Sequence, residues 1–129
     1  MNNVLIRNAV ETDLPFIYAT WLKGLYHDKL WPAFRVVHQD TFYPNYHRVI
    51  ESILSRSTVF VACLEDEPDV VLGYSVVSGN TLHWIFIKKA WRGNKIAKQL
   101  VPVTINSVSH LTKLGQKLKP KEWEYNPFL

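Results

Sequence analysis

Cysteine is nearly absent from this sequence, and Cys63 is its only example. A single cysteine excludes an internal disulfide and is typical of a reducing compartment, so we expect a cytoplasmic protein. Long apolar runs are missing too, so no membrane-spanning helix is predicted. Met1–Val10 also lacks the charged-then-apolar pattern of a secretory leader. These absences predict a chain that does not contact a membrane.

Internal repeats, low-complexity tracts and linkers between domains are missing as well. The 129 residues are enough for one hydrophobic core and too few for two, so a single domain spanning 1–129 is predicted. The histidines His27, His38 and His47 match no metal-ligand spacing, so no metal site is predicted.

Acidic residues are missing from the segment 88–98, which holds five basic side chains. Four more lysines fall within 113–121, although the net charge is only +4. Such clustering fits either a phosphorylated cofactor or nucleic acid. A small basic nucleic-acid-binding module therefore stays open as an alternative, but no familiar DNA- or RNA-reading motif accompanies the charge.

The hydrophobic pattern predicts a mixture of helices and strands. Apolar residues at helical spacing predict one helix from Leu14 to Leu25 and another from about Tyr46 to Ser55. β-branched content and alternation predict strands at Val4–Ala9, Thr58–Leu64, Val70–Val77 and Thr81–Ile87, with a last strand within Glu122–Tyr125. Short polar turns between consecutive strands indicate antiparallel pairing.

The most informative segment is the turn that follows the strand Thr81–Ile87. It contains four basic residues and opens into a helix at about Ile96. The first turn of a helix has backbone N–H groups without internal partners, and the aligned peptide dipoles add partial positive charge there. The ligand expected at this turn therefore carries phosphate.

The predicted helix after this turn contains one irregularity. Ile96, Leu100, Val103, Val108 and Leu111 give it an apolar face, and Pro102 lies inside it. Because proline removes one internal hydrogen bond and clashes with the preceding turn, we expect a kink near 98–101.

The run Arg92-Gly93-Asn94-Lys95-Ile96-Ala97 resembles motif A of the GNAT family of N-acetyltransferases, whose signature is Arg/Gln-x-x-Gly-x-Gly/Ala. Arg92 and Ala97 match the signature, and Ile87, Trp91 and Gly93 fit its surroundings. Lys95 departs from it, because the family usually has glycine there. In the family the backbone amides of this loop bind the pyrophosphate of acetyl-coenzyme A.

The resemblance implies an α+β fold like that of the acyl-CoA N-acyltransferases. It has a mixed, mostly antiparallel sheet flanked by helices, in the order β-α-α-β-β-β-α-β. It also implies that the single domain 1–129 lacks the usual C-terminal helix and strands, which close one side of the coenzyme cleft. Short chains of this kind loosely resemble tailed-phage gene products.

The activity implied is transfer of an acetyl group from acetyl-CoA to a primary amine of unknown acceptor. The coenzyme would contact Ile85, Phe86, Ile87, Arg92, Gly93, Asn94, Lys95, Ile96 and Ala97. A backbone N–H within Ile85–Ile87 would stabilise the oxyanion. Some family members carry a catalytic histidine on this strand, so His83 is the candidate general base, and Tyr125 is the candidate general acid.

Alternation along the strand predicts that His83, Ile85 and Ile87 share one face, and that Leu82, Trp84 and Phe86 share the other. His83 also has a simpler interpretation, as a structural histidine at the surface of the sheet. Lys95, Pro102 and the short C-terminus keep open an inactive binding or regulatory protein on the same scaffold. The shortened sheet and the apolar chain end suggest a homo-oligomer.

Overall fold

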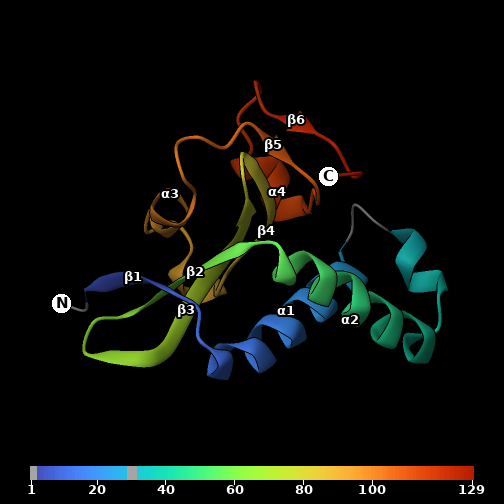
Figure 1. The fold of residues 1–129 in the computed structure, drawn as a ribbon, viewed down its shortest axis with the longest axis horizontal. Coiled ribbons are helices and arrows are strands. Elements are labelled where there is room, and N and C mark those ends of the chain that lie inside the picture. Colours follow the sequence, from blue (N-terminus) through green and yellow to red (C-terminus); the bar gives the residue numbers. More distant parts are fainter. Residues whose placement is uncertain (1–2, 29–31) are drawn as a thin grey trace.

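The computed structural model describes residues 3–28 and 32–129, which form one six-stranded sheet with helices on both faces (Figure 1). The strands are β1 (Val4–Asn8), β2 (Thr58–Leu64), β3 (Glu67–Ser78), β4 (Thr81–Ile87), β5 (Ser107–Val108) and β6 (Glu124–Tyr125). The α-helices are α1 (Leu14–Tyr26), α2 (Gln39–Ser55), α3 (Ile96–Leu100) and α4 (Lys113–Leu118), and short 3-10 helices span Glu11–Asp13, Pro32–Val36 and Lys89–Trp91.

The strands follow one another across the sheet in the order of the sequence. β1 to β4 are antiparallel, because tight turns join β2 to β3 and β3 to β4. Gly79 lies in the second turn with a φ of 58°, a conformation that glycine adopts without steric cost. β5 and β6 run parallel to β4, and within the described residues β5 pairs with β4 only at Thr81 and Leu82. The C-terminal half of β4 therefore has an open edge.

Two hydrophobic cores lie on opposite faces of this sheet. Helices α1 and α2 pack on one face, where Trp21 and Trp84 stack with ring centroids 5.1 Å apart. On the other face α3 inserts Ile96 and Leu100 against Leu82, Ile85 and Ile87, among others. No helix in the described ranges is long and apolar enough to cross a membrane.

The predicted helices and strands are largely found. Strands Thr58–Leu64 and Thr81–Ile87 have their predicted bounds, and the first helix covers the predicted span. The second helix begins earlier than predicted, at Gln39, because His38 caps it by accepting a hydrogen bond from the Asp40 N–H at 3.2 Å. Pro44 lies in its second turn and does not interrupt it.

The helix predicted after residue 96 is wrong beyond its first turn. α3 ends at Leu100, and Val101 is extended, with φ −103° and ψ 115°. Proline disfavours the helical conformation of the residue before it, so Pro102 stops the helix instead of bending it. Val108 belongs to β5, and α4 follows before the last strand, so two elements are present that the predicted order did not contain.

The predicted alternation along β4 is also wrong at its first residues. Val76 pairs with Trp84 but Val77 pairs with Leu82, so His83 is the extra residue of a β-bulge. Leu82 consequently lies in the same core as Ile85 and Ile87, while Trp84 and Phe86 belong to the core beneath α1 and α2.

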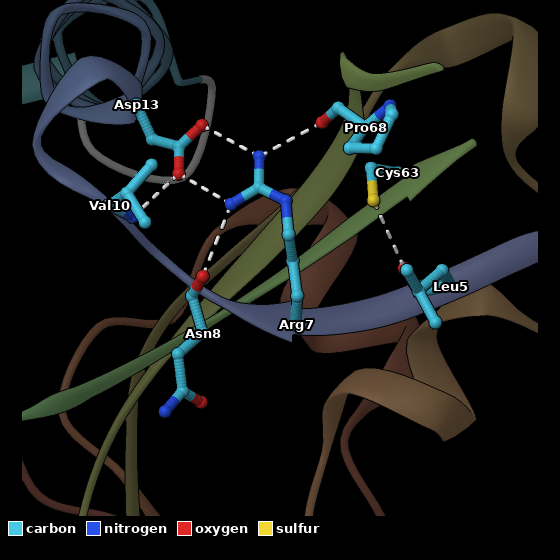
Figure 2. A network of polar contacts seen from close by, with 7 residues as sticks. All are labelled: Leu5, Arg7, Asn8, Val10, Asp13, Cys63 and Pro68. Atoms are coloured by element: carbon cyan, nitrogen blue, oxygen red, sulfur yellow. Dashed lines mark hydrogen bonds and ion pairs between the residues drawn. The ribbon is translucent and has the colours of Figure 1, made fainter. Parts of the chain in front are cut away.

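A partly buried ion pair fastens β1 to the start of α1 (Figure 2). Arg7 donates to both carboxylate oxygens of Asp13, at 2.7 and 3.0 Å, and to the Pro68 carbonyl oxygen at 3.0 Å. The Val10 N–H donates to Asp13 at 2.8 Å. The Arg7 guanidinium lowers the pKa of Asp13 below its usual value, and the Val10 hydrogen bond acts in the same direction.

Candidate functional site

The loop between β4 and α3 is held closed by its own side chains. The Arg92 Nε donates to the Ile87 carbonyl oxygen at 3.0 Å, and the Asn94 side chain donates to the Trp91 carbonyl oxygen at 3.1 Å. Two of its residues have a left-handed backbone, Gly93 with a φ of 84° and Lys95 with a φ of 61°. Backbones that alternate right- and left-handed conformations turn successive N–H groups to one side, which favours anions.

Positive charge surrounds this loop. The Lys88 ammonium is half-buried and lies 5.4 Å from the centroid of the Phe16 ring. The exposed basic side chains of the loop and of α3 are Lys89, Arg92, Lys95 and Lys98. Because α3 has only five residues, its dipole is small. Attraction of an anion would therefore come from the loop backbone and from these basic side chains.

The predicted coenzyme residues of this segment fall into two groups. Arg92, Gly93, Asn94 and Lys95 are exposed in the loop. Ile96 is buried against the sheet, and Ala97 lines a cavity beside β4. The loop residues are thus accessible and Ala97 faces the cavity, whereas Ile96 anchors α3.

The backbone of β4 offers hydrogen-bonding groups at its open edge. The Lys88 N–H donates to the Leu72 carbonyl oxygen of β3 at 2.8 Å. Hydrogen bonds to one neighbour alternate along an antiparallel strand, so Phe86 also turns its backbone groups toward β3. Ile85 and Ile87 turn theirs toward the side from which β5 has diverged. Of the three residues predicted to supply an oxyanion donor, Ile85 and Ile87 are oriented for it.

A largely apolar cavity of about 470 Å³ fills the space between the diverging strands. At one end Ala97 and Lys98 line it, next to the basic loop. Trp84 and His110 also line it, and both contact Trp21 of α1 on the opposite face of the sheet. The cavity therefore extends from α3 to two side chains that contact α1.

The segment after β5 forms the far wall of the cavity, through Leu111, Thr112, Gly115, Lys119, Pro120 and Trp123. α4 is held here by Thr112, whose hydroxyl accepts a hydrogen bond from the Gly115 N–H at 2.9 Å.

His83 lies behind this cavity instead of in its wall. It is 1% exposed, and its Nδ1 is 2.6 Å from the Ser109 hydroxyl oxygen. The same hydroxyl is 2.9 Å from Nδ1 of His110, whose Nε2 makes a short hydrogen bond with the Tyr46 hydroxyl of α2. The four side chains form one buried hydrogen-bonded chain, hereafter the His83–Tyr46 chain.

Burial keeps both histidines of this chain uncharged. It lowers the pKa of His83 to about 4, and the charge of Arg56 lowers it further in the same direction. Burial likewise lowers the pKa of His110 to about 4, and a charge on His83 adds to that effect. Burial raises the pKa of the Tyr46 hydroxyl, with Tyr125 contributing. At neutral pH the chain carries no net charge.

Tyr125 lies on β6, opposite Val108 of β5. It is half-buried, and this burial raises the pKa of its hydroxyl. Its charge adds to the rise in the pKa of the Tyr46 hydroxyl. From the sequence, Tyr46 is expected only as one of several aromatic residues that could line an acceptor pocket, and His110 has no expected role. The one indication for His110 in the sequence is its position two residues after Val108, and this position can be interpreted only when Val108 is known to lie in β5.

Within 3–28 and 32–129, no three potential metal ligands come together.

No protein-family model matches the sequence, and no curated protein matches it. Among solved structures, YjaB from Escherichia coli aligns with a TM-score of 0.52, at 18% identity over 76% of this chain and 61% of that one. An N-acetyltransferase from Staphylococcus aureus Mu50 aligns with a TM-score of 0.47, at 21% identity over 76% and 61%. The yncA protein from Salmonella typhimurium, solved with its cofactor acetyl-CoA, aligns with a TM-score of 0.47, at 20% identity over 75% and 58%.

This chain thus spans about three fifths of the length of each of these proteins. At such identities the likeness to YjaB shows a shared fold. The fold predicted from the sequence, α+β with a mixed, mostly antiparallel sheet flanked by helices, is confirmed.

Proposed function

We propose that this protein is an acetyl-CoA-dependent N-acetyltransferase that acts on a primary amine. The observation that carries the proposal is the cavity beside β4, which is lined at one end by Ala97 and Lys98 of α3, the helix that follows the basic loop, and which also reaches Trp84 and His110. Acetyl-CoA has a phosphorylated end, a long flexible arm and a reactive thioester, and these three parts fit the basic loop, the apolar cavity and the region of Trp84 and His110 in that order.

The loop would hold the phosphates. Backbone N–H groups near Gly93 and Lys95 provide directional donors, and the Arg92 guanidinium keeps donors free of its bond to Ile87. The arm would pass through the apolar cavity, which Ile85 lines, beside the outward-facing N–H groups of Ile85 and Ile87 at the open edge of β4. The carbonyl of the thioester would then lie near these N–H groups, which stabilise the developing oxyanion.

The amine must lose a proton before or during its attack. With a lysine-like pKa near 10.4, only about one molecule in a few thousand is free base at pH 7. His83 was predicted as the base, and in this structure it reaches the cavity only through Ser109 and His110. Tyr125 stays the candidate acid that protonates the leaving thiolate.

Calorimetric titration with acetyl-CoA, with coenzyme A alongside, tests the proposal. We expect saturable binding to the wild-type protein and at least tenfold weaker binding to Arg92→Glu, because the reversal places a carboxylate beside the phosphates. Lys23→Glu is the matched control, an exposed charge reversal on α1 that should keep wild-type affinity. Absence of binding to the wild type at millimolar coenzyme refutes the proposal, and equal affinity in Arg92→Glu refutes the phosphate site.

A further inference from the structure

The number of protons in the His83–Tyr46 chain restricts the tautomers of its two histidines. The Ser109 hydroxyl lies within hydrogen-bond distance of Nδ1 of both His83 and His110, at 2.6 and 2.9 Å. A hydroxyl has one proton, so Ser109 donates to one ring and must accept from the other. A neutral imidazole carries its proton on one nitrogen only. The tautomers of the two histidines are therefore coupled.

Two arrangements satisfy this constraint. In the first, Ser109 donates to His83, and His110 carries its proton on Nδ1 and accepts the Tyr46 proton at Nε2. In the second every bond is reversed, and His110 carries its proton on Nε2 and donates it to Tyr46. Only the first arrangement leaves His110 with a basic nitrogen toward Tyr46.

His83 forms the closed end of this chain. Its Nε2 is buried and has no hydrogen-bond partner in the described part of the protein. A buried polar atom without a partner costs free energy and is rare, so its presence here needs an explanation. The other end is open: His110 lines the cavity, and Tyr46 is half-buried on α2. Arg56 acts electrostatically on His83, and Tyr125 acts on Tyr46.

The position of the open end fits the direction of the cavity. If phosphates occupy the basic loop on the α3 face, the reactive end of the coenzyme lies toward Trp84 and His110. An amine must then approach from the face that α1 and α2 cover, which is where the Tyr46 hydroxyl lies.

We propose that the His110–Tyr46 pair receives the proton of the attacking amine, and that His83 and Ser109 are positioning residues that set the tautomer of His110. This rests on the acetyltransferase activity proposed above. The amine nitrogen forms a bond to the thioester carbonyl carbon, and the C–S bond breaks with its electron pair on sulfur. The amine proton passes to the Tyr46 oxygen while the Tyr46 proton passes to Nε2 of His110. The thiolate takes its proton from Tyr125, the candidate acid, and Tyr125 recovers a proton from His110 through Tyr46, which restores the neutral chain.

The imidazole tautomers are measured by long-range proton–nitrogen NMR correlation on isotope-labelled protein. We expect wild-type His110 protonated on Nδ1 and His83 on Nε2, and we expect Ser109→Ala to shift His110 toward the other tautomer. Ser107→Ala is the matched control, because Ser107 makes a similar buried bond to Thr81 at 2.9 Å outside the chain and should leave both rings unchanged. Wild-type His110 protonated on Nε2 overturns the proposal even if Ser109→Ala fails to fold.

The same spectra recorded with acetyl-CoA locate the reactive end. Saturation with acetyl-CoA should shift the His110 ring signals relative to saturation with coenzyme A, because only acetyl-CoA carries the thioester carbonyl that would lie beside the ring. Identical His110 signals in both complexes overturn the placement. If acetyl-CoA does not bind, the proposed function fails, whereas the tautomers of the free protein still decide the coupling between His83 and His110.

Discussion

Lys95 occupies a backbone conformation that few side chains adopt. Its φ of 61° and ψ of 20° lie in the left-handed region, which costs an L-residue about 1 kcal/mol or more. The motif that the loop resembles has glycine here, and the structure gives the physical reason: the chain must turn through a positive φ to enter α3. The departure thus keeps the conformation of the loop and adds both strain and a charge.

Lys95→Gly should leave the free energy of unfolding unchanged or raise it. Glycine removes the steric cost of this conformation in the folded state, and this gain offsets the larger entropy of glycine in the unfolded state. Lys98→Gly is the matched control. It removes an exposed lysine inside α3, where glycine costs about 1 kcal/mol. Urea unfolding of both variants measures the difference, and an equal loss in the two would show that Lys95 is not strained.

Asp13 illustrates a residue whose charge stabilises the fold. Asp13→Asn should lower the free energy of unfolding by about 2 kcal/mol at pH 7, since Arg7 and the Val10 N–H lose a charged acceptor. The pKa of Asp13 is lowered in the folded protein, so this contribution is complete above the unfolded pKa of 3.8 and is lost as the pH falls through the folded value. Asp40→Asn is the control: its side chain is 92% exposed beside His38, and the change should stay within about 0.5 kcal/mol. Equal effects of the two changes contradict this account.

At the scale of elements, the sequence predicts long strands better than short ones. Thr58–Leu64 and Thr81–Ile87 are long enough for their β-branched content to be recognised. β5 has two residues, too few for any alternation, and its apolar neighbours fit the continuation of a helix. Pro102 alone does not distinguish a kinked helix from a helix that ends. A kink and an end both satisfy its local constraints, and the pairing of β5 with β4 decides between them.

The spacing of β3 and β4 depends on Gly73. A Cβ atom at this position would lie 2.5 Å from the Phe86 carbonyl oxygen and 3.1 Å from Cα of Ile87, both backbone atoms that cannot rotate away. Gly73→Ala should therefore cost about 1–3 kcal/mol and move β4 at the residues that face the cavity, weakening acetyl-CoA binding as well. Thermal unfolding and calorimetric titration measure the two effects.

Gly24→Ala serves as the control for that substitution. It adds the same atom in α1, where the nearest contact, the Trp84 ring, is at 3.4 Å, and alanine favours the helix by about 1 kcal/mol. A Gly73→Ala protein as stable as Gly24→Ala would show that the two strands have room to separate.

At the scale of the whole molecule, the basic loop can be predicted from the sequence, whereas the His83–Tyr46 chain cannot. The loop is continuous in sequence, so its charges and its glycine can be read directly. Tyr46, His83 and His110 meet only because β5 pairs beside β4 and α2 covers that face. The β-bulge at His83 breaks the alternation that would place His83 on the same face as Ile85 and Ile87. No pattern of residues in the sequence predicts this bulge.

The two buried histidines give the whole molecule a distinct acid response. Their pKa values of about 4 lie below the 6.5 of the unfolded chain, so the unfolded state alone takes up protons as the pH falls from 6.5 toward 4. Stability is complete above pH 6.5 and decreases through this window, by about 3 kcal/mol for His83. The loss from Asp13 follows at lower pH, so the two effects separate.

Urea unfolding at several pH values between 7.5 and 4.5 measures this loss. His83→Gln should reduce the slope of stability against pH, whatever its effect on stability at pH 7.5, because the variant has one fewer buried imidazole to protonate on unfolding. His47→Gln removes an exposed histidine of α2 and should keep the wild-type slope. A wild-type stability that is constant from pH 6.5 to 4.5 would mean that the histidines take up protons equally in the folded and unfolded states, and the lowering of their pKa values by burial would then be excluded.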